Sequence, residues 1–198
     1  MARKTDTARD STPATLRGRE IVVAICGGIA AYKVADLVSK LVQAGAGVSV
    51  CMTREAQEFI TSLTFQALSG RPVRTDMFHL LDASDPQHIA ITENADLMIV
   101  APATNNIIAK VAHGICDDLI STMICASACP VVFAPSMNSR MWANAICQEN
   151  VAKLTKLGYR FIGPDSGWLA CRAVGPGRLA DPSRLFAELV AMLPDKPR

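Results

Sequence analysis

The chain has 198 residues and a net charge of +2, from 20 basic and 18 acidic side chains. Half of the residues are hydrophobic and 19% are charged, which excludes an intrinsically disordered protein. The basic excess lies within residues 1–20, so bulk charge gives no reason to expect nucleic-acid binding, and no apolar run reaches the length of a membrane-spanning helix.

Residues 1–18 are polar and lack the apolar segment of a secretory signal. We therefore predict a disordered tail at 1–18, followed by a single domain at 19–198. The seven cysteines are odd in number and include no CxxC pair, and several stand within apolar runs. This usage indicates free core thiols rather than a disulfide framework, and hence a cytoplasmic protein.

Strand and helix patterns alternate along the chain. An apolar run predicts a first strand over 21–26, and apolar residues at helical spacing over 34–42 predict a helix that Gly45 ends. The later predicted elements are a strand at 48–52, a helix at 54–68, irregular chain at 70–87, a strand at 97–101 ending at Pro102, helices at 104–113 and 117–127, a strand at 131–134, a helix at 145–157, a strand at 159–162, a glycine-rich and proline-rich loop at 163–181 and a helix at 183–193. This alternation predicts an α/β fold, a doubly wound parallel sheet of the Rossmann-like or flavodoxin-like kind with helices on both faces.

Ligands of such sheets bind beyond the carboxyl ends of the strands. The residues that follow the predicted strands are glycines, hydroxyls, amides and one arginine. The candidate cofactor-binding set is Gly27, Gly28, Ile29, Thr53, Arg54, Thr104, Asn105, Asn106 and Ser136. These groups suit a phosphate and a polar heterocycle, and the two glycines would let backbone N–H groups approach an anion. The alternative for the glycine pair is a plain strand-to-helix turn with nothing bound.

The first turn, GGIAAYK at 27–33, lacks the GxGxxG pattern of dinucleotide sites. Thr53 and Arg54 follow the second strand, at the place where an acid would bind the ribose of NAD, so NAD is disfavoured. Arg54 could bind the 2′-phosphate of NADP, which therefore remains an alternative. A mononucleotide such as FMN fits better than either. His79, His88 and His113 are scattered and none pairs with a cysteine at ligand spacing, so we expect no metal site.

Cys171 differs from the other cysteines because it lies in the glycine-rich loop at 163–181, beside Arg172 and near Arg178. A thiol near two arginines could serve as an acid, and a mobile loop that carries a reactive group is the usual form of an active-site lid. An exposed cysteine without a chemical role is an equal alternative at this point.

Six segments resemble the flavin-dependent cysteine decarboxylases, in unbroken order from about residue 20 to 195. They are GGIAAYK at 27–33, QHI at 87–89, APATNN at 101–106, GICDDL at 114–119, PSMNSRMW at 135–142, and GPDSGWLAC with GPGRLADP within 163–182. The resemblance implies FMN, held by the candidate set given above. It also implies a homo-oligomer, a trimer or dodecamer, with flavin sites at subunit contacts.

The same resemblance implies a carbon–carbon lyase with a small-molecule substrate. This enzyme would decarboxylate 4′-phospho-N-pantothenoylcysteine to 4′-phosphopantetheine in coenzyme A biosynthesis, by thiol oxidation to a thioaldehyde, loss of CO2 and re-reduction of the enethiolate. His88 would be the base or orienting group, Asn138 would hold the substrate and Cys171 would donate a proton. Met141 and Ala170 complete the implied substrate-binding set.

Other activities share this architecture. A peptidyl-cysteine decarboxylase of the lantibiotic type would stop after oxidative decarboxylation, and a regulatory flavoprotein would keep the fold without turnover. A flavin prenyltransferase would lack the histidine, PxMNxxMW and loop-cysteine set. One departure from the family is Arg172-Ala173 after Cys171, where glycine and an acid are common. We expect this change to stiffen the loop, which puts loop closure in question.

Overall fold

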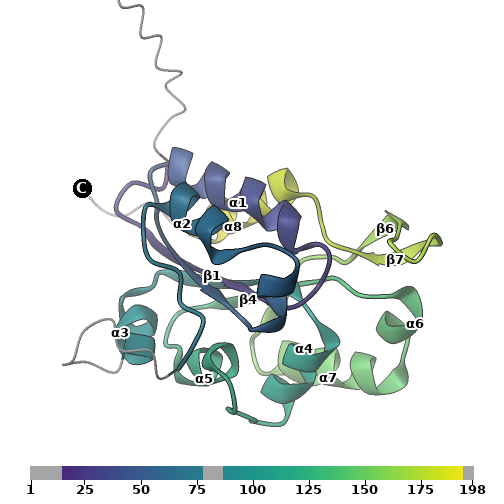
Figure 1. Ribbon diagram of the computed structural model, residues 1–198. Coiled ribbons are helices and arrows are strands. Elements are labelled where there is room, and N and C mark those ends of the chain that lie inside the picture. The colour runs from purple at the N-terminus through teal and green to yellow at the C-terminus, as the bar shows by residue number, and fades with distance from the viewer. Residues whose placement is uncertain (1–14, 78–86, 194–198) are drawn as a thin grey trace, which may run out of the picture.

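The computed structural model describes residues 15–77 and 87–193, with the side chains of 87–90 outside that description (Figure 1). Its main sheet has five parallel strands in the order β2-β1-β3-β4-β5. The strands are β1 (Glu20–Ile25), β2 (Gly47–Met52), β3 (Leu97–Ala103), β4 (Val131–Pro135) and β5 (Arg160–Phe161), followed by a separate antiparallel pair, β6 (Asp165–Trp168) and β7 (Val174–Arg178). This is the flavodoxin-like strand order, so the predicted fold class is confirmed.

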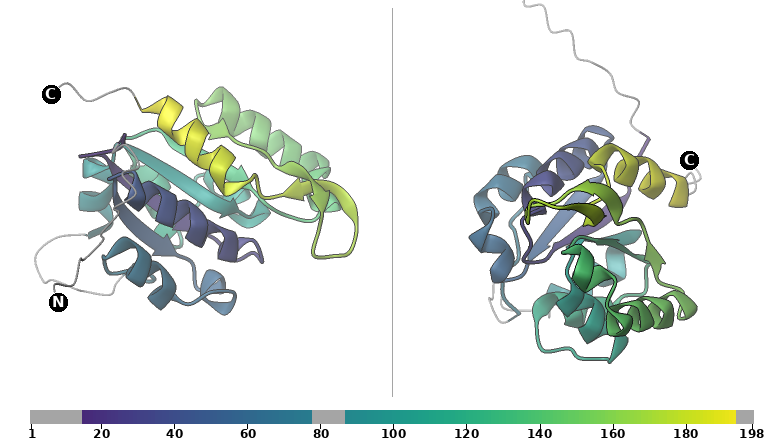
Figure 2. Two further views of the ribbon diagram at one scale, coloured as in Figure 1. Left: turned by 90° about the horizontal axis from the view of Figure 1, so that it is seen from above. Right: turned by 90° about the vertical axis from the view of Figure 1, so that its right-hand side faces the viewer.

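Helices cover both faces of the sheet. They are α1 (Ala31–Gln43), α2 (Ser62–Ser69), α3 (Gln87–Asn94), α4 (Asn105–Ala112), α5 (Leu119–Ala126), α6 (Ser139–Trp142), α7 (Ala145–Lys156) and α8 (Pro182–Met192), with a 3-10 turn η1 at Glu55–Glu58. Figures 1 and 2 show α1, α2 and α8 on one face and α4, α5 and α7 on the other. None of the helices within the described ranges is both long enough and apolar enough to cross a membrane.

The core follows from the two-residue period of the strands. Along β1, Ile21, Val23 and Ile25 pack with α1 and α8, whereas Val22 and Ala24 pack with α4 and α5. Both faces of β1 are therefore buried, which is why the sequence of this strand is a continuous apolar run instead of an alternating one.

Two predicted elements have different boundaries in the structure. The predicted helix at 54–68 is divided into η1 and α2, because Thr61 has an extended backbone, with a ψ of 153°, and begins the second helix as its N-cap. The predicted end of a strand at Pro102 is wrong, because β3 continues to Ala103. Proline is tolerated there since the pairing register of β3 with β4 shifts between Val100 and Ala103.

Two further differences concern segments that were predicted to be irregular. Within 163–181, predicted as loop, the chain forms the β6–β7 hairpin, which extends beyond the end of the main sheet (Figure 2). Leu16 lies within the predicted tail, but it is 1% exposed and its N–H donates to the Ala44 carbonyl at 2.9 Å. Residues 15–18 therefore form a turn that packs onto the domain, while 1–14 lie outside the described residues.

Candidate functional site

The strand order reverses between β1 and β3, and the polar turns after these two strands lie next to each other. The Cys26 N–H donates to the Pro102 carbonyl at 3.4 Å, and a Cβ added at Gly28 would lie 3.7 Å from Pro102 and 3.9 Å from Thr104. A crevice opens at this position in doubly wound sheets because the two turns lead to opposite faces.

Two cavities open at this end of the sheet. The larger, about 580 Å³, is enclosed by the turns after β1, β3 and β4 together with the β6–β7 hairpin, and we call it the hairpin cavity. The smaller, about 390 Å³, lies between the ends of β1, β2 and β3 and the start of α5, and we call it the acidic cavity. Gly27, Thr104 and Asn106 line both of them.

The predicted site residues divide between the two cavities. The hairpin cavity contains most of them: Gly27, Gly28, Ile29, Thr104, Asn105, Asn106, Ser136, Asn138, Met141, Ala170 and Cys171. Thr53 and Arg54 line only the acidic cavity. His88 lies on α3, but its side chain is outside the described part of the chain, as is His79. His113 caps the end of α4 and its Nδ1 lies 2.9 Å from the Ala109 carbonyl oxygen, so its predicted place at a helix end is confirmed.

Backbone hydrogen bonds dock the hairpin onto the turn after β4. The Met137 N–H donates to the Gly177 carbonyl at 2.9 Å, and the Ser136 hydroxyl donates to the same oxygen at 3.3 Å. Gly177 has a φ of 135°, and a Cβ there would collide with the Met137 carbonyl oxygen. Glycine is therefore required at 177 for this close approach.

This docking brings together Asn138 and Cys171, which are 33 residues apart. The Asn138 Nδ2 donates to the Cys171 Sγ at 3.4 Å, and its Oδ1 accepts from the Arg140 N–H at 2.8 Å as the N-cap of α6. The amide is thus fixed at one end by the helix and presents its other end to the thiol.

Cys171 occupies the tip of the hairpin. The Arg172 N–H donates to the Leu169 carbonyl and the Leu169 N–H donates to the Ala173 carbonyl, each at 2.9 Å, so residues 170–172 form a three-residue loop. Arg172 has a φ of 64°, in the left-handed region that the third residue of such loops adopts and that favours glycine. This chain therefore holds an arginine in a strained conformation at a position whose backbone favours glycine.

The charged groups that line the hairpin cavity are Lys33 and Arg178, and no carboxylate is among its lining residues. Within the described part of the chain, the Arg178 Nε is buried without a hydrogen-bond partner, and so is the Asn105 Oδ1. Buried polar atoms are rarely left without a partner, so a free donor and a free acceptor indicate a polar ligand in this cavity. Sequence patterns gave Arg178 a role only as a neighbour of Cys171 and gave Lys33 none.

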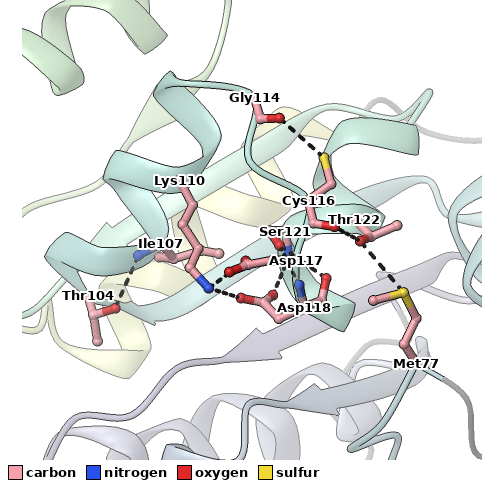
Figure 3. Close-up of polar contacts among 10 residues, drawn as sticks. All are labelled: Met77, Thr104, Ile107, Lys110, Gly114, Cys116, Asp117, Asp118, Ser121 and Thr122. Atoms are coloured by element: carbon pink, nitrogen blue, oxygen red, sulfur yellow. Dashed lines mark hydrogen bonds and ion pairs between the residues drawn. The ribbon is translucent and has the colours of Figure 1, made fainter.

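The acidic cavity has the opposite composition. Lys110 lies 2.7 Å from both Asp117 and Asp118 (Figure 3). The cavity is also lined by Glu55, Asp76 and Arg54. Burial alone would raise the pKa of Asp118, but hydrogen bonds from Lys110 and Ser121 outweigh burial and lower it. Its carboxylate also forms a capping box with Ser121 at the start of α5. These contacts fix the loop between α4 and α5 to the cavity lining.

Local contacts explain why Gly27 occupies the turn after β1 and Thr53 the turn after β2. The Thr53 Oγ1 accepts from the Ala56 N–H at 3.2 Å at the start of η1. A Cβ at Gly27 would collide with Glu55, so glycine allows the two turns to meet.

Cys26, which lines the acidic cavity, is fully buried, and burial raises the pKa of its thiol to about 12. Among the described residues, no group of three His, Cys, Asp or Glu side chains could hold a metal ion.

The chain is similar to known proteins over most of its length. The sequence profile of the Flavoprotein family matches residues 9–193. The chain is 44% identical over 183 residues to the coenzyme A biosynthesis bifunctional protein CoaBC of Vibrio vulnificus, covering 92% of this chain and 46% of the relative. The chain therefore spans less than half the length of that relative.

Two solved structures share the fold over most of their length. The FMN-dependent cysteine decarboxylase SpaF is 29% identical with a TM-score of 0.77, covering 89% of this chain and 97% of SpaF. A PPC decarboxylase mutant complexed with pantothenoylaminoethenethiol is 26% identical with a TM-score of 0.78, covering 89% and 98%.

Proposed function

The chain belongs to the Flavoprotein family, and on that premise we propose that it is an FMN-dependent carboxy-lyase that converts 4′-phospho-N-pantothenoylcysteine to 4′-phosphopantetheine in coenzyme A biosynthesis. The names of the relatives support this substrate, since one is a coenzyme A biosynthesis protein and another binds pantothenoylaminoethenethiol. The observation that carries the proposal is the contact of Asn138 with Cys171 at the edge of a cavity whose charged residues are all cationic.

The residues at the strand ends fit FMN. The free acceptor at Asn105 and the hydroxyl of Thr104 offer hydrogen-bonding groups, and the hairpin cavity of about 580 Å³ that they line with Gly28 offers room for a polar heterocycle. The residues that would hold the cofactor are Gly27, Gly28, Ile29, Thr53, Arg54, Thr104, Asn105, Asn106 and Ser136. When bound, FMN would supply the two-electron redox chemistry that makes loss of CO2 from a cysteine derivative feasible.

Cys171 would act as the proton donor for the carbanion-like carbon that remains after CO2 has left. The Asn138 amide supports this role, because its hydrogen bond to Sγ fixes the thiol at the cavity edge. The same amide would hold the substrate when the substrate displaces that contact, with Met141 and Ala170 beside it. We propose His88 as the base that assists oxidation of the substrate thiol.

The charge of the hairpin cavity suits the substrate. The substrate carries a phosphate and a carboxylate, and Lys33 and Arg178 are the charged groups that line this cavity. Because no carboxylate lines it, both anionic groups can approach without like-charge repulsion. The free Nε of Arg178 would gain a charge-assisted hydrogen bond on binding.

We also propose that the protein is cytoplasmic and forms a homo-oligomer, a trimer or a dodecamer, with the site at subunit contacts. Large apolar side chains around the hairpin cavity support this, since Ile29, Tyr32, Met141 and Trp168 are each about half exposed or more. A contiguous exposed apolar surface beside a site is typical of a protein–protein contact. Sedimentation analysis of the purified protein measures the assembly directly.

The decisive experiment is anaerobic incubation of the FMN-loaded protein with the phosphorylated substrate, followed by mass spectrometry of the product. Loss of CO2 alone supports the complete, redox-neutral cycle. Loss of CO2 together with two hydrogen atoms, with reduced flavin, contradicts the redox-neutral cycle and supports a peptidyl-cysteine decarboxylase. The strained Arg172 at the hairpin tip is the observation that favours this second candidate. Absence of any product, with FMN bound, contradicts both and supports a regulatory flavoprotein.

A further inference from the structure

Two exposed cysteines lie on neighbouring segments outside both cavities. Cys116 lies in the loop between α4 and α5, and Cys125 lies in the last turn of α5. The Thr122 hydroxyl donates to the Cys116 carbonyl oxygen at 3.3 Å, which places the loop against one face of α5 (Figure 3). Cys125 is three residues after Thr122 and therefore shares that face.

The side chains of the two cysteines also interact. The neighbouring Cys125 thiol, slight burial and the nearby charges of Asp117 and Asp118 raise the pKa of the Cys116 thiol. The Cys116 thiol also lies 3.8 Å from the Gly114 carbonyl. Neither cysteine lines the hairpin cavity or the acidic cavity, and the proposed function uses neither of them.

We propose that Cys116 and Cys125 are an oxidisable pair that forms an intramolecular disulfide by exchange with a low-molecular-weight disulfide. One protein thiolate attacks the small disulfide, forms a mixed disulfide and releases one small thiol. The second cysteine then attacks the protein sulfur of the mixed disulfide and releases the other small thiol. The two cysteines lose two electrons and two protons in total, and the small disulfide is reduced to two thiols.

The bond would tie the loop at 113–118 to the C-terminal turn of α5. This loop carries Asp117 and Asp118, which bind Lys110 at the edge of the acidic cavity. A covalent link closing a short loop removes freedom mainly from the unfolded chain, so the oxidised protein is more stable than the reduced one. The link also holds the lining of the acidic cavity in its present arrangement.

The test is incubation of the FMN-loaded protein with glutathione disulfide, followed by denaturation, alkylation and peptide mapping. We expect two fewer alkylated cysteines than in the reduced protein, with the bond mapped to 116 and 125 and a higher thermal midpoint that a reductant reverses. A disulfide mapped elsewhere, or stable glutathione adducts on both cysteines, overturns the proposal.

Matched variants separate the pair from general thiol reactivity. Cys125→Ser leaves Cys116 without a resolving thiol, so the glutathione adduct should persist there. Cys129→Ser removes a half-buried thiol two residues beyond α5's C-cap and should leave the disulfide unchanged. An intramolecular bond that survives Cys125→Ser contradicts the assignment.

Discussion

The two cavities lie side by side at the carboxyl ends of the strands and share Gly27, Thr104 and Asn106, yet their charges are arranged in opposite ways. In the acidic cavity, Lys110 already has two carboxylate partners. In the hairpin cavity, Arg178 has a buried nitrogen without a partner in the described part of the chain. Charges that satisfy each other stabilise structure, whereas charges left free are available to a ligand.

This difference predicts that mutations in the two cavities affect different quantities. Changes in the hairpin cavity should alter catalysis or substrate affinity and leave the free energy of unfolding nearly unchanged. Changes at the paired charges of the acidic cavity, Lys110, Asp117 and Asp118, should lower the free energy of unfolding first.

The largest expected effect is that of Cys171→Ser. A positioned general acid contributes about 10²–10⁴-fold to rate, so formation of the fully reduced product should fall by that factor. The product that accumulates should lack CO2 and two hydrogen atoms, since the earlier steps do not need the thiol. Mass spectrometry of single-turnover samples measures both species. Cys125→Ser, which changes an exposed thiol that lines neither cavity, is the control, and equal losses in the two variants would contradict the role of Cys171.

Replacement of Arg178 comes next. Hydrogen bonds to charged groups contribute about 1.5–3 kcal/mol, so Arg178→Met should lower kcat/KM roughly 10–100-fold, mainly through KM. With a substrate that lacks the phosphate, wild type and variant should differ much less if Arg178 contacts that group. Lys156→Met, on the surface end of α7, is the matched control. An equal loss with both substrates would instead assign Arg178 to the carboxylate end or to the structure of the hairpin.

Lys110→Met tests the acidic cavity. Removing the cation leaves Asp117 and Asp118 without their partner, and we expect a loss of about 1–3 kcal/mol in the free energy of unfolding, measured by urea denaturation. The KM of the variant should stay within a few-fold of wild type. A large rise in KM with an unchanged free energy of unfolding would contradict this prediction and would assign Lys110 to ligand binding.

The same variant has a predicted pH dependence. Because the pKa of Asp118 is lowered in the folded protein, its contribution to stability is complete above the ordinary aspartate pKa of about 4 and is lost as the pH falls through the folded value. Wild type should therefore lose more stability than Lys110→Met between neutral pH and about pH 3. Parallel pH curves for the two proteins would contradict this linkage.

The contrast between the cavities also explains what the sequence could predict. The sheet and most of its helices follow from apolar periodicity, as in β1, where Val22 and Val23 are both buried because both faces of the strand are covered. The site residues after β1, β2, β3 and β4 follow from the topology alone, because the carboxyl ends of parallel strands meet at one edge.

The β6–β7 hairpin could not be predicted in this way. Its strands contain glycine, proline and polar residues, so it has no alternating apolar face, and its position depends on backbone contacts between Gly177 and Met137. The meeting of Asn138 with Cys171 depends on the same contacts, so the sequence could single out Cys171 by its loop but could not predict that Asn138 would contact it. Lys110 with its two carboxylates was missed because the pairing crosses the turn between α4 and α5.

The smallest expected effect concerns Arg172 at the hairpin tip. A left-handed backbone costs a non-glycine residue about 1–2 kcal/mol, while glycine loses about 0.5–1 kcal/mol more in conformational entropy on folding. Arg172→Gly should therefore raise the free energy of unfolding by about 0–1.5 kcal/mol, measured by urea denaturation.

Arg172→Ala separates backbone strain from charge, because alanine removes the guanidinium and keeps the penalty of a φ of 64°. It should show no such gain, and an equal gain in both variants would assign the effect to the loss of charge. Since Arg172 lines neither cavity, Arg172→Gly should change the formation of the fully reduced product far less than Cys171→Ser does. If it changes that step as strongly, the conformation of the tip, and not only its thiol, governs the proton transfer.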